Sequence, residues 1–423
     1  MKDAGRFLLT LLIGFCIDVS LSAQPAARKA PALPELRTEQ LRIPAPASEV
    51  RAMLLTPEQL WLLAPAADTL PDRLLAAPSD LSQPFRTLNV PFRAAWNALA
   101  VRPDGRILLA GHIPASTGAD LAVMSLLPDG SPDAGFGTRG MAVLPSPGNE
   151  EAVRLLLLPD GQVLLAAHTW RHQWADRDLL LVRLTPGGQP DPDFGVRGFQ
   201  KINIGAYDQV RDIAADSQGR ILLAAQHLSG AFQDMALIRL LPDGRLDPAF
   251  ARNGIYKPDY QSHSRLVQAI AAGPDGSVYA FAHHQAGAGP AGFDWLTLRL
   301  SSEGQPVRSH GPAGFGSTDL GGLEYATDLH IAPDGTVWLL GLRDRAPVIS
   351  SLDAAGKPGA WQPLADPGRS CDQRYAWIPL PGGAFRYAGL QAGTLTLTSI
   401  RTLSPAYSPA YQIPSPTLSA QHP

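Results

Sequence analysis

An apolar run, a tight turn and a second apolar run recur six times along this 423-residue chain. Examples are ALAVRPDGRILLAGH (98–112), RLLLLPDGQVLLAAH (154–168) and DLHIAPDGTVWLLGL (328–342). In these turns Pro fixes φ, Asp bonds its own backbone and Gly accepts a positive φ. A fixed period of this length indicates supersecondary units that stack on one another. The turn glycines are Gly105, Gly161, Gly219, Gly276, Gly335 and Gly383, spaced by 56, 58, 57, 59 and 48 residues.

Two further signals share this period. A second strand-and-turn phrase, such as DLLLVRLTPGG (178–188), opens with Asp and fades in the fifth repeat. A third segment, such as QPDPDFGVRG (189–198), places Phe three residues after Asp and precedes another short strand. We interpret the Asp residues as turn or loop caps and the Phe residues as plugs between repeats. These positions are Asp120, Asp178, Asp234 and Asp294, and Phe136, Phe194 and Phe250.

Each period therefore holds four strands, and their nearly continuous apolar character predicts that both faces are covered. Forty Gly and forty Pro residues suit a chain rich in turns. We predict an all-β fold, a six-bladed β-propeller of four-stranded blades over residues 86–412. The sixth repeat lacks a fourth strand, and RTLNV (86–90) has the spacing of one without a blade of its own. This N-terminal strand is predicted to close the ring and so to remove a sheet edge.

The N-terminal region predicts export. Residues 1–23 carry Lys2 and Arg6, then an apolar run (7–17) and small residues, as in a signal peptide cleaved near residues 22–23. The protein is then secreted or periplasmic, and Cys371 remains alone, so no internal disulfide is expected. Residues 24–85 are predicted to be a Pro/Ala-rich linker with short helices, and 413–423 a flexible tail. The expected helices are Glu49–Leu55, Pro57–Leu63 and Pro71–Ala76.

The repeat resembles that of the delta-60 repeat proteins, which are secreted bacterial chains. Their pattern is similar to DGxLDxxFGxxG, a PDG hairpin and DFALVRLNxDG, and here DPDFGVRG, the PDG turns and DLLLVRL match it. The resemblance covers roughly residues 86–400 and is specific in repeats one to four. It implies a β-propeller-type architecture and a secreted location, and it implies no particular activity.

Histidines recur where the second strand of each hairpin ends, on the face where propellers usually bind. The candidate rim is His112, His168, His227, His283 and Arg343. Such a rim could hold an anionic ligand, or a metal through His and Asp. The competing structural interpretation is favoured, because the following Asp recurs with the repeat and four blades set the His residues far apart. We therefore expect no metal and no cofactor.

Polar residues on the innermost strands form a second candidate group, with Asp212, Asp328 and His330 as the axial candidates. Glu150, Glu151 and Glu324 fall in loops that could join such a site. The set has mixed registers and matches no catalytic motif, so a solvated channel lining is the preferred interpretation. No phosphate loop, nucleophile elbow or H-E-x-x-H motif occurs.

Three functions remain open. A net charge of −3 gives no basic face for nucleic acid, and no segment after the leader is apolar enough to span a membrane. The preferred function is a monomeric binding module for a protein or an envelope glycan. The first alternative is a metal-dependent lactonase- or lyase-like hydrolase with an axial site. The second is a structural or adhesive envelope protein, for which exposed apolar residues in 48–80 would be the sign.

Overall fold

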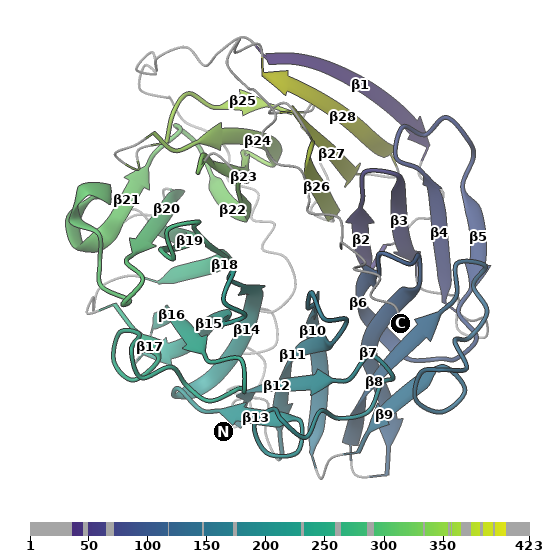
Figure 1. Cartoon of the computed structure of the whole chain (residues 1–423). Coiled ribbons are helices and arrows are strands. Elements are labelled where there is room, and N and C mark those ends of the chain that lie inside the picture. Colours follow the sequence, from purple (N-terminus) through teal and green to yellow (C-terminus); the bar gives the residue numbers. More distant parts are fainter. Residues whose placement is uncertain are drawn as a thin grey trace, which may run out of the picture.

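The computed structural model describes residues 36–44, 50–64, 72–116, 118–145, 148–171, 176–229, 232–258, 264–285, 292–332, 335–353, 356, 358–364, 374–380, 384–391 and 394–402. The fold is all-β, and the strands lie in antiparallel sheets around a ring (Figure 1). No helix within these ranges is long and apolar enough to cross a membrane. The predicted signal peptide, the tail 413–423, Gly383 and Cys371 lie outside the described residues.

The described strands form seven four-stranded units, which we number along the chain. Unit 1 is β2 (Ala52–Leu55), β3 (Gln59–Ala64), β4 (Arg73–Pro78) and β5 (Arg86–Asn89). Unit 2 is β6 (Ala95–Val101), β7 (Ile107–Ala115), β8 (Gly118–Leu126) and β9 (Met141–Leu144). Unit 3 is β10 (Asn149–Leu157), β11 (Val163–Trp170), β12 (Asp178–Leu184) and β13 (Phe199–Ile202). One parallel pair, Asn149 with Ala119, joins units 2 and 3.

The later units follow the same plan. Unit 4 is β14 (Ala206–Ala215), β15 (Ile221–Ser229), β16 (Phe232–Leu240) and β17 (Ile255–Tyr256). Unit 5 is β18 (Arg265–Ala272), β19 (Val278–Gln285), β20 (Phe293–Leu300) and β21 (Phe315–Thr318), with short 3-10 helices η2 (Arg308–His310) and η3 (Pro312–Gly314). Unit 6 is β22 (Glu324–Ile331), β23 (Val337–Arg343), β24 (Ala346–Ser351) and β25 (Gln362–Pro363). Unit 7 is β26 (Arg374–Leu380), β27 (Ala384–Gln391), β28 (Thr394–Thr402) and β1 (Leu36–Pro44).

The apolar core lies between neighbouring units rather than inside any one of them. Leu108 and Leu121 of unit 2, for example, pack with Val163 and Val182 of unit 3. The first and last units share a core as well, in which Leu62 of unit 1 is fully buried with residues of β28. A single four-stranded sheet leaves both of its faces exposed to water, so the stability of each unit depends on two neighbours. The ring is the arrangement that gives every unit both of them.

The described residues of the N-terminal region form strands where a linker with short helices was expected. The helices expected at Glu49–Leu55, Pro57–Leu63 and Pro71–Ala76 are replaced by β2, β3 and β4. The N–H of Gln59 donates to Oγ1 of Thr56 (2.9 Å), as at a helix N-cap, but the chain turns back with Leu55 paired to Leu60. The apolar run is explained by β3, whose residues are buried on both faces. A one-sided helix could not bury such a run.

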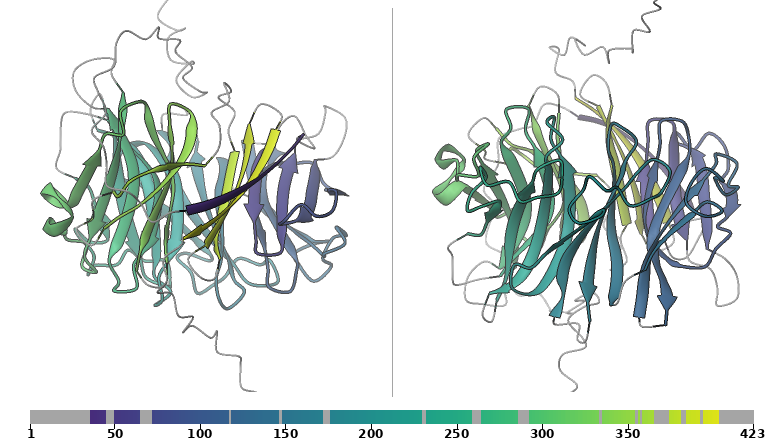
Figure 2. Two further views of the ribbon diagram at one scale, coloured as in Figure 1. Left: turned by 90° about the horizontal axis from the view of Figure 1, so that it is seen from above. Right: turned by 60° about the horizontal axis from the view of Figure 1, so that its bottom comes forward.

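The expected blade count and the choice of residues 86–90 as the closing strand were therefore both wrong, although a strand from the N-terminal region does complete the last unit. Residues 86–89 form a fourth strand, as their spacing indicated, but β5 pairs with β4 of its own unit. A short connection costs less loop entropy than pairing with a strand some 300 residues away. The outer strand of the last unit is β1, which pairs antiparallel with β28 from Leu36–Thr402 to Pro44–Thr394. Figure 2 shows β1 beside the yellow strands, while β2 to β5 stand in the neighbouring sheet.

The inner strand of units 2 to 6 carries a register shift at a constant place. In β14 it lies between Val210 and Asp212, and in β22 between Ala326 and Asp328. A bulge of this kind leaves one residue outside the ladder and re-aims the side chains beside it. In each of these units, the bulge lies near the rim formed by the ends of the hairpins. The turn glycines at the other end of the hairpins have φ between +74° and +84°.

Candidate functional site

Two of the rim histidines, His168 and His283, are buried and bond across the boundary between units. Nε2 of His168 (β11) accepts a hydrogen bond from the N–H of Val210 on β14, at 2.9 Å. Nδ1 of His283 (β19) accepts one from the N–H of Ala326 on β22, at 3.3 Å. Gln226 has the same place in unit 4, and its Nε2 donates to the carbonyl of Arg265 on β18 (3.4 Å). These side chains satisfy backbone groups beside the inner-strand bulge of the next unit.

Burial keeps these rings neutral. Desolvation lowers the pKa of His283 to about 3, and the charges of Arg211 and His284 add to this effect. Its ring also makes edge contacts with Phe293 and Tyr325, each with centroids 5.2 Å apart. The pKa of His168 is lowered by burial as well, against the opposing effect of Glu151, whose Oε2 lies 3.6 Å from its Nδ1.

The other predicted rim residues are dispersed. Burial lowers the pKa of His112 on β7, with the charge of Glu151 opposing it. His227 on β15 lies 3.1 Å, through Nδ1, from the carbonyl of Leu228. Arg343 ends β23, where its Nη2 donates to the carbonyl of Gly321 (3.0 Å). The structure thus does not gather the five rim residues around one ligand site.

The axial candidates are held in bonds between inner strands. Asp212 accepts hydrogen bonds from Nε of Arg154 (3.4 Å) and from the N–H of Ile270 (3.0 Å). Asp328 accepts one from Nε1 of Trp377, at 2.7 Å. Burial, and then the charge of Asp212, raises the pKa of Asp328 to about 6. Asp212 thus joins the inner strands of units 3, 4 and 5, and Asp328 joins those of units 6 and 7.

His330 on β22 lies edge-on to Trp377, with ring centroids 5.9 Å apart. It belongs to the same inner-strand surface as Asp328, two residues before it on β22. Within the described residues, Asp212, Asp328 and His330 do not form a group with ligand atoms at metal-binding spacing. Glu324 lies apart from them, at the start of β22 and fully buried.

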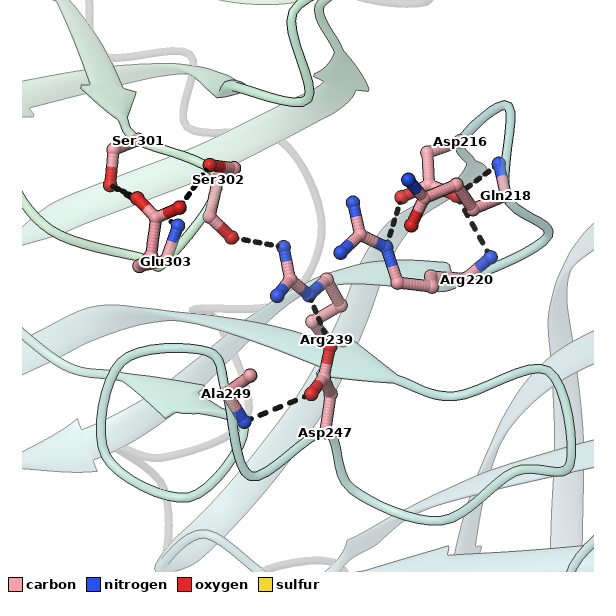
Figure 3. A network of polar contacts seen from close by, with 9 residues as sticks. All are labelled: Asp216, Gln218, Arg220, Arg239, Asp247, Ala249, Ser301, Ser302 and Glu303. Atoms are coloured by element: carbon pink, nitrogen blue, oxygen red, sulfur yellow. Dashed lines mark hydrogen bonds and ion pairs between the residues drawn. The ribbon is translucent and has the colours of Figure 1, made fainter.

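In units 3 and 4, an Arg, an Asp and a Phe link each unit to the next on the face opposite the rim. We call this group of three residues the staple. Nε of Arg239 donates to Oδ2 of Asp247 (2.8 Å), and its Nη1 donates to the carbonyl of Ser302 in unit 5 (2.5 Å; Figure 3). Its guanidinium lies 4.5 Å from the ring centroid of Phe250. Arg183, Asp191 and Phe194 repeat this arrangement one unit earlier, with the carbonyl of Pro242 as the acceptor.

The Phe ring of each unit packs against a glycine of the following unit, in the turn after that unit's third strand. The rings of Phe136, Phe194 and Phe250 are fully buried. A Cβ placed on Gly188 would meet the Phe136 ring at 2.8 Å, and one on Gly244 would meet Phe194 at 2.8 Å. A hollow of about 440 Å³ lies beside this network, lined by Asp216, Arg220 and Glu303 among others. Arg220 and Asp216 are paired there at 2.6 Å, so the charges serve the fold.

A cleft of about 360 Å³ lies on the rim face over unit 3. Half-buried Trp170 and Thr169 at the end of β11 line it beside Glu150 at the start of β10. Asp178 completes it and is held by Nζ of Lys201 and Nδ2 of Asn203, both at 2.5 Å. The cleft thus combines an aromatic face with hydroxyl, carboxylate and ammonium groups. None of the five predicted rim residues lines the cleft; Thr169 follows His168 directly in the sequence, and Trp170 was not predicted.

The sequence was compared with known protein families. The family described as "Domain of unknown function (DUF5122) beta-propeller" matches residues 102–136, 158–194 and 218–250. This chain is similar to the DUF5122 β-propeller family. Each matched segment runs from the inner hairpin turn to the Phe of the staple, so the similarity to DUF5122 rests on the residues that hold neighbouring units together. No curated protein matches the sequence.

Among solved structures, polysaccharide lyase Uly1 is similar at 11% identity, over 84% of this chain and 90% of that chain, with a TM-score of 0.53. Alpha-L-arabinanase of Penicillium chrysogenum (12%; 83% and 99%) and the β-propeller domain of the Trilobed protease of Pyrococcus furiosus (10%; 85% and 96%) each have a TM-score of 0.46. At these identities the likeness to the lyase is one of fold.

Proposed function

We propose that this chain is a secreted or periplasmic β-propeller that binds a glycan through the cleft at Trp170. The observation that carries the proposal is the combination of a half-buried indole with hydrogen-bonding groups in one hollow on the rim face. A sugar ring presents an apolar face and equatorial hydroxyls, and aromatic side chains with polar neighbours suit both. The location rests on the N-terminal segment, whose composition is that of a signal peptide.

The binding role is preferred to a hydrolytic one because two carboxylates of the cleft and the two axial carboxylates already have partners. Asp178 is paired with Lys201, and Oε1 of Glu150 lies 3.4 Å from the hydroxyl of Thr169. Asp212 and Asp328 are engaged by Arg154 and Trp377. The adhesive alternative would need exposed apolar residues in 48–80, whereas Leu60 and Leu62 are fully buried there.

The test is calorimetric titration of the mature protein with chito-oligosaccharides, together with sedimentation with purified peptidoglycan sacculi. We expect Trp170→Ala to weaken binding about tenfold or more, since loss of a buried ligand contact costs on the order of 1.4 kcal/mol or above. Phe232→Ala is the matched control, because Phe232 is an exposed aromatic residue outside the cleft. Equal binding by both variants would show that the glycan does not bind in this cleft. Release of reducing sugar would establish the hydrolase alternative instead.

A further inference from the structure

We propose that a calcium ion binds where units 5 and 6 meet, through the carboxylates of Asp294, Asp319 and Glu324. Asp294 lies on β20, Asp319 follows β21, and Glu324 opens β22. One oxygen of each carboxylate lies within 4.8 Å of those of the other two. Calcium takes oxygen ligands and tolerates irregular geometry, so carboxylates from two strands and a loop suit it.

Glu324 is the residue that demands a counter-charge. Its side chain is fully buried, and neither carboxylate oxygen has a hydrogen-bond partner of normal geometry among the described residues. A buried carboxylate without compensation is costly. Burial, and then the charges of Asp294 and Asp319, raise the pKa of Glu324 to about 8, with a weaker opposing effect of nearby backbone groups. A bound cation would supply the missing compensation.

The same three positions occur two units earlier with one carboxylate fewer and with a lysine beside them. There they are Asp178, Asn203 and Asp208, in which Asn203 donates to Oδ1 of Asp178 (2.5 Å). Nζ of Lys201 lies 2.5 Å from Oδ2 of the same Asp178. Asp208 accepts a hydrogen bond from the N–H of Ile204 (2.7 Å). This junction therefore carries two carboxylates, an amide and an ammonium group.

The junction between units 4 and 5 uses a different built-in cation. Asp234 on β16 is bonded by Nε and Nη2 of Arg265 on β18, at 2.9 and 2.6 Å. Arg265 stands where Glu324 stands one unit later, two residues before the strand register shifts. These two junctions thus supply a protein cation to the Asp near the start of the third strand.

The junction between units 5 and 6 has neither of these two protein cations. Ser317 takes the place of Lys201, as the third residue of the outer strand, and Asp319 takes that of Asn203. Nε2 of His284 lies 3.0 Å from the Ser317 hydroxyl. Within the described parts of the chain, no Lys or Arg forms an ion pair with Asp294, Asp319 or Glu324. An external cation is the remaining source of positive charge.

The loop from Asp319 to Glu324 is held in place independently of any ion. Oδ1 of Asp319 accepts the N–H of Gly321 (2.6 Å), and Oδ1 of Asp344 accepts that of Leu323 (3.0 Å). Arg343 is the cross-strand neighbour of Glu324, but its guanidinium bonds the Gly321 carbonyl and lies 4.7 Å from the centre of the Trp361 ring. Arg343 therefore orders the loop and forms no ion pair with the carboxylate of Glu324.

The experiment compares thermal unfolding of the mature protein in EDTA and in millimolar CaCl₂, with equilibrium dialysis of ⁴⁵Ca²⁺ for stoichiometry. Calcium should raise the melting temperature by several degrees, and one ion should bind per chain. Asp319→Asn restores the amide found at Asn203 and should abolish the response. Ser317→Lys restores the ammonium of Lys201. It should raise the melting temperature in EDTA and remove the calcium response.

Three results would overturn the proposal. One is an unchanged melting temperature in calcium with no bound ion, which would mean that Glu324 is held protonated against Asp294 or neutralised by Arg343. Another is a calcium response that survives in Asp319→Asn, which would place the ion elsewhere. The third is an equal response to MgCl₂, which would contradict the assignment to calcium. Glycan binding at Trp170 is a separate measurement, and neither result decides the other.

Discussion

Nε2 of His168 accepts the backbone N–H of Val210, so a side chain of one unit completes the hydrogen bonding of the next. The bulge in β14 is the reason that this N–H is available. His283 and Ala326 repeat the relationship further along the ring. Residues that look like a ligand rim in the sequence therefore act as connectors between sheets.

His168→Ala should lower the free energy of unfolding by about 1–3 kcal/mol, because it leaves the buried N–H of Val210 without an acceptor. His168→Gln should recover most of this loss, since Gln226 occupies the same position in unit 4 and reaches the next inner strand. Urea denaturation of the two variants measures the difference. Equal stability of His168→Ala and the parent protein would show that this hydrogen bond does not matter.

Arg239→Ala should lower the free energy of unfolding by about 3–5 kcal/mol, because it leaves the buried carboxylate of Asp247 without its ion-pair partner. The matched control is Arg245→Ala, in which the lost ion pair with Asp243 is solvent-exposed (side chains 74% and 42% exposed) and should cost less than about 1 kcal/mol. Denaturant titration of both variants provides the comparison. Similar losses in the two variants would contradict a structural role for the staple.

Stability should fall as the pH is lowered from about 6.5 towards 3, in part through His283. The unfolded chain takes up a proton on this ring near its ordinary pKa of 6.5, whereas the folded protein resists it down to about 3. Protonation thus favours unfolding throughout that window, and the full stability is present above it. His283→Gln should flatten the slope of stability against pH. An identical slope in the variant would assign the acid sensitivity to other groups.

A chain that begins at residue 45 should be less stable and more prone to aggregation than one that begins at Leu36. The shorter chain leaves the edge of β28 unpaired over nine register positions. Melting temperature and light scattering distinguish the two chains. Equal behaviour would mean that β1 is dispensable, and removal of residues 86–90 should then be compared as the alternative closure.

The repeat unit could be predicted from sequence, since Pro-Asp-Gly turns and apolar runs fix hairpins locally. The number of units could not. Unit 1 turns at Thr56 through a side-chain hydrogen bond and has none of the glycine turns that mark the later units. The pairing of β1 with β28 joins residues at opposite ends of the chain, and no local pattern specifies such a partner.

The candidate sites were harder to predict because their meaning depends on the neighbouring unit. A His at the end of a hairpin has the same sequence signature whether it binds a ligand or a backbone amide. The cluster of Asp294, Asp319 and Glu324 is a site that the sequence analysis did not predict. Asp319 becomes conspicuous when it is aligned with Asn203, and Ser317 when it is aligned with Lys201 and Lys257. An alignment of the repeats within this one sequence is enough to show both differences.

The position of β1 also has a consequence for biosynthesis. Leu36 and its partner Thr402 are 366 positions apart, so the ribosome finishes the last sheet on the order of tens of seconds after making its outer strand. During that time β1 has no partner to pair with. The nascent protein must therefore carry an unpaired strand until residues 394–402 have been synthesised. Any cellular factor that shields extended polypeptide would act on this protein at its N-terminal end.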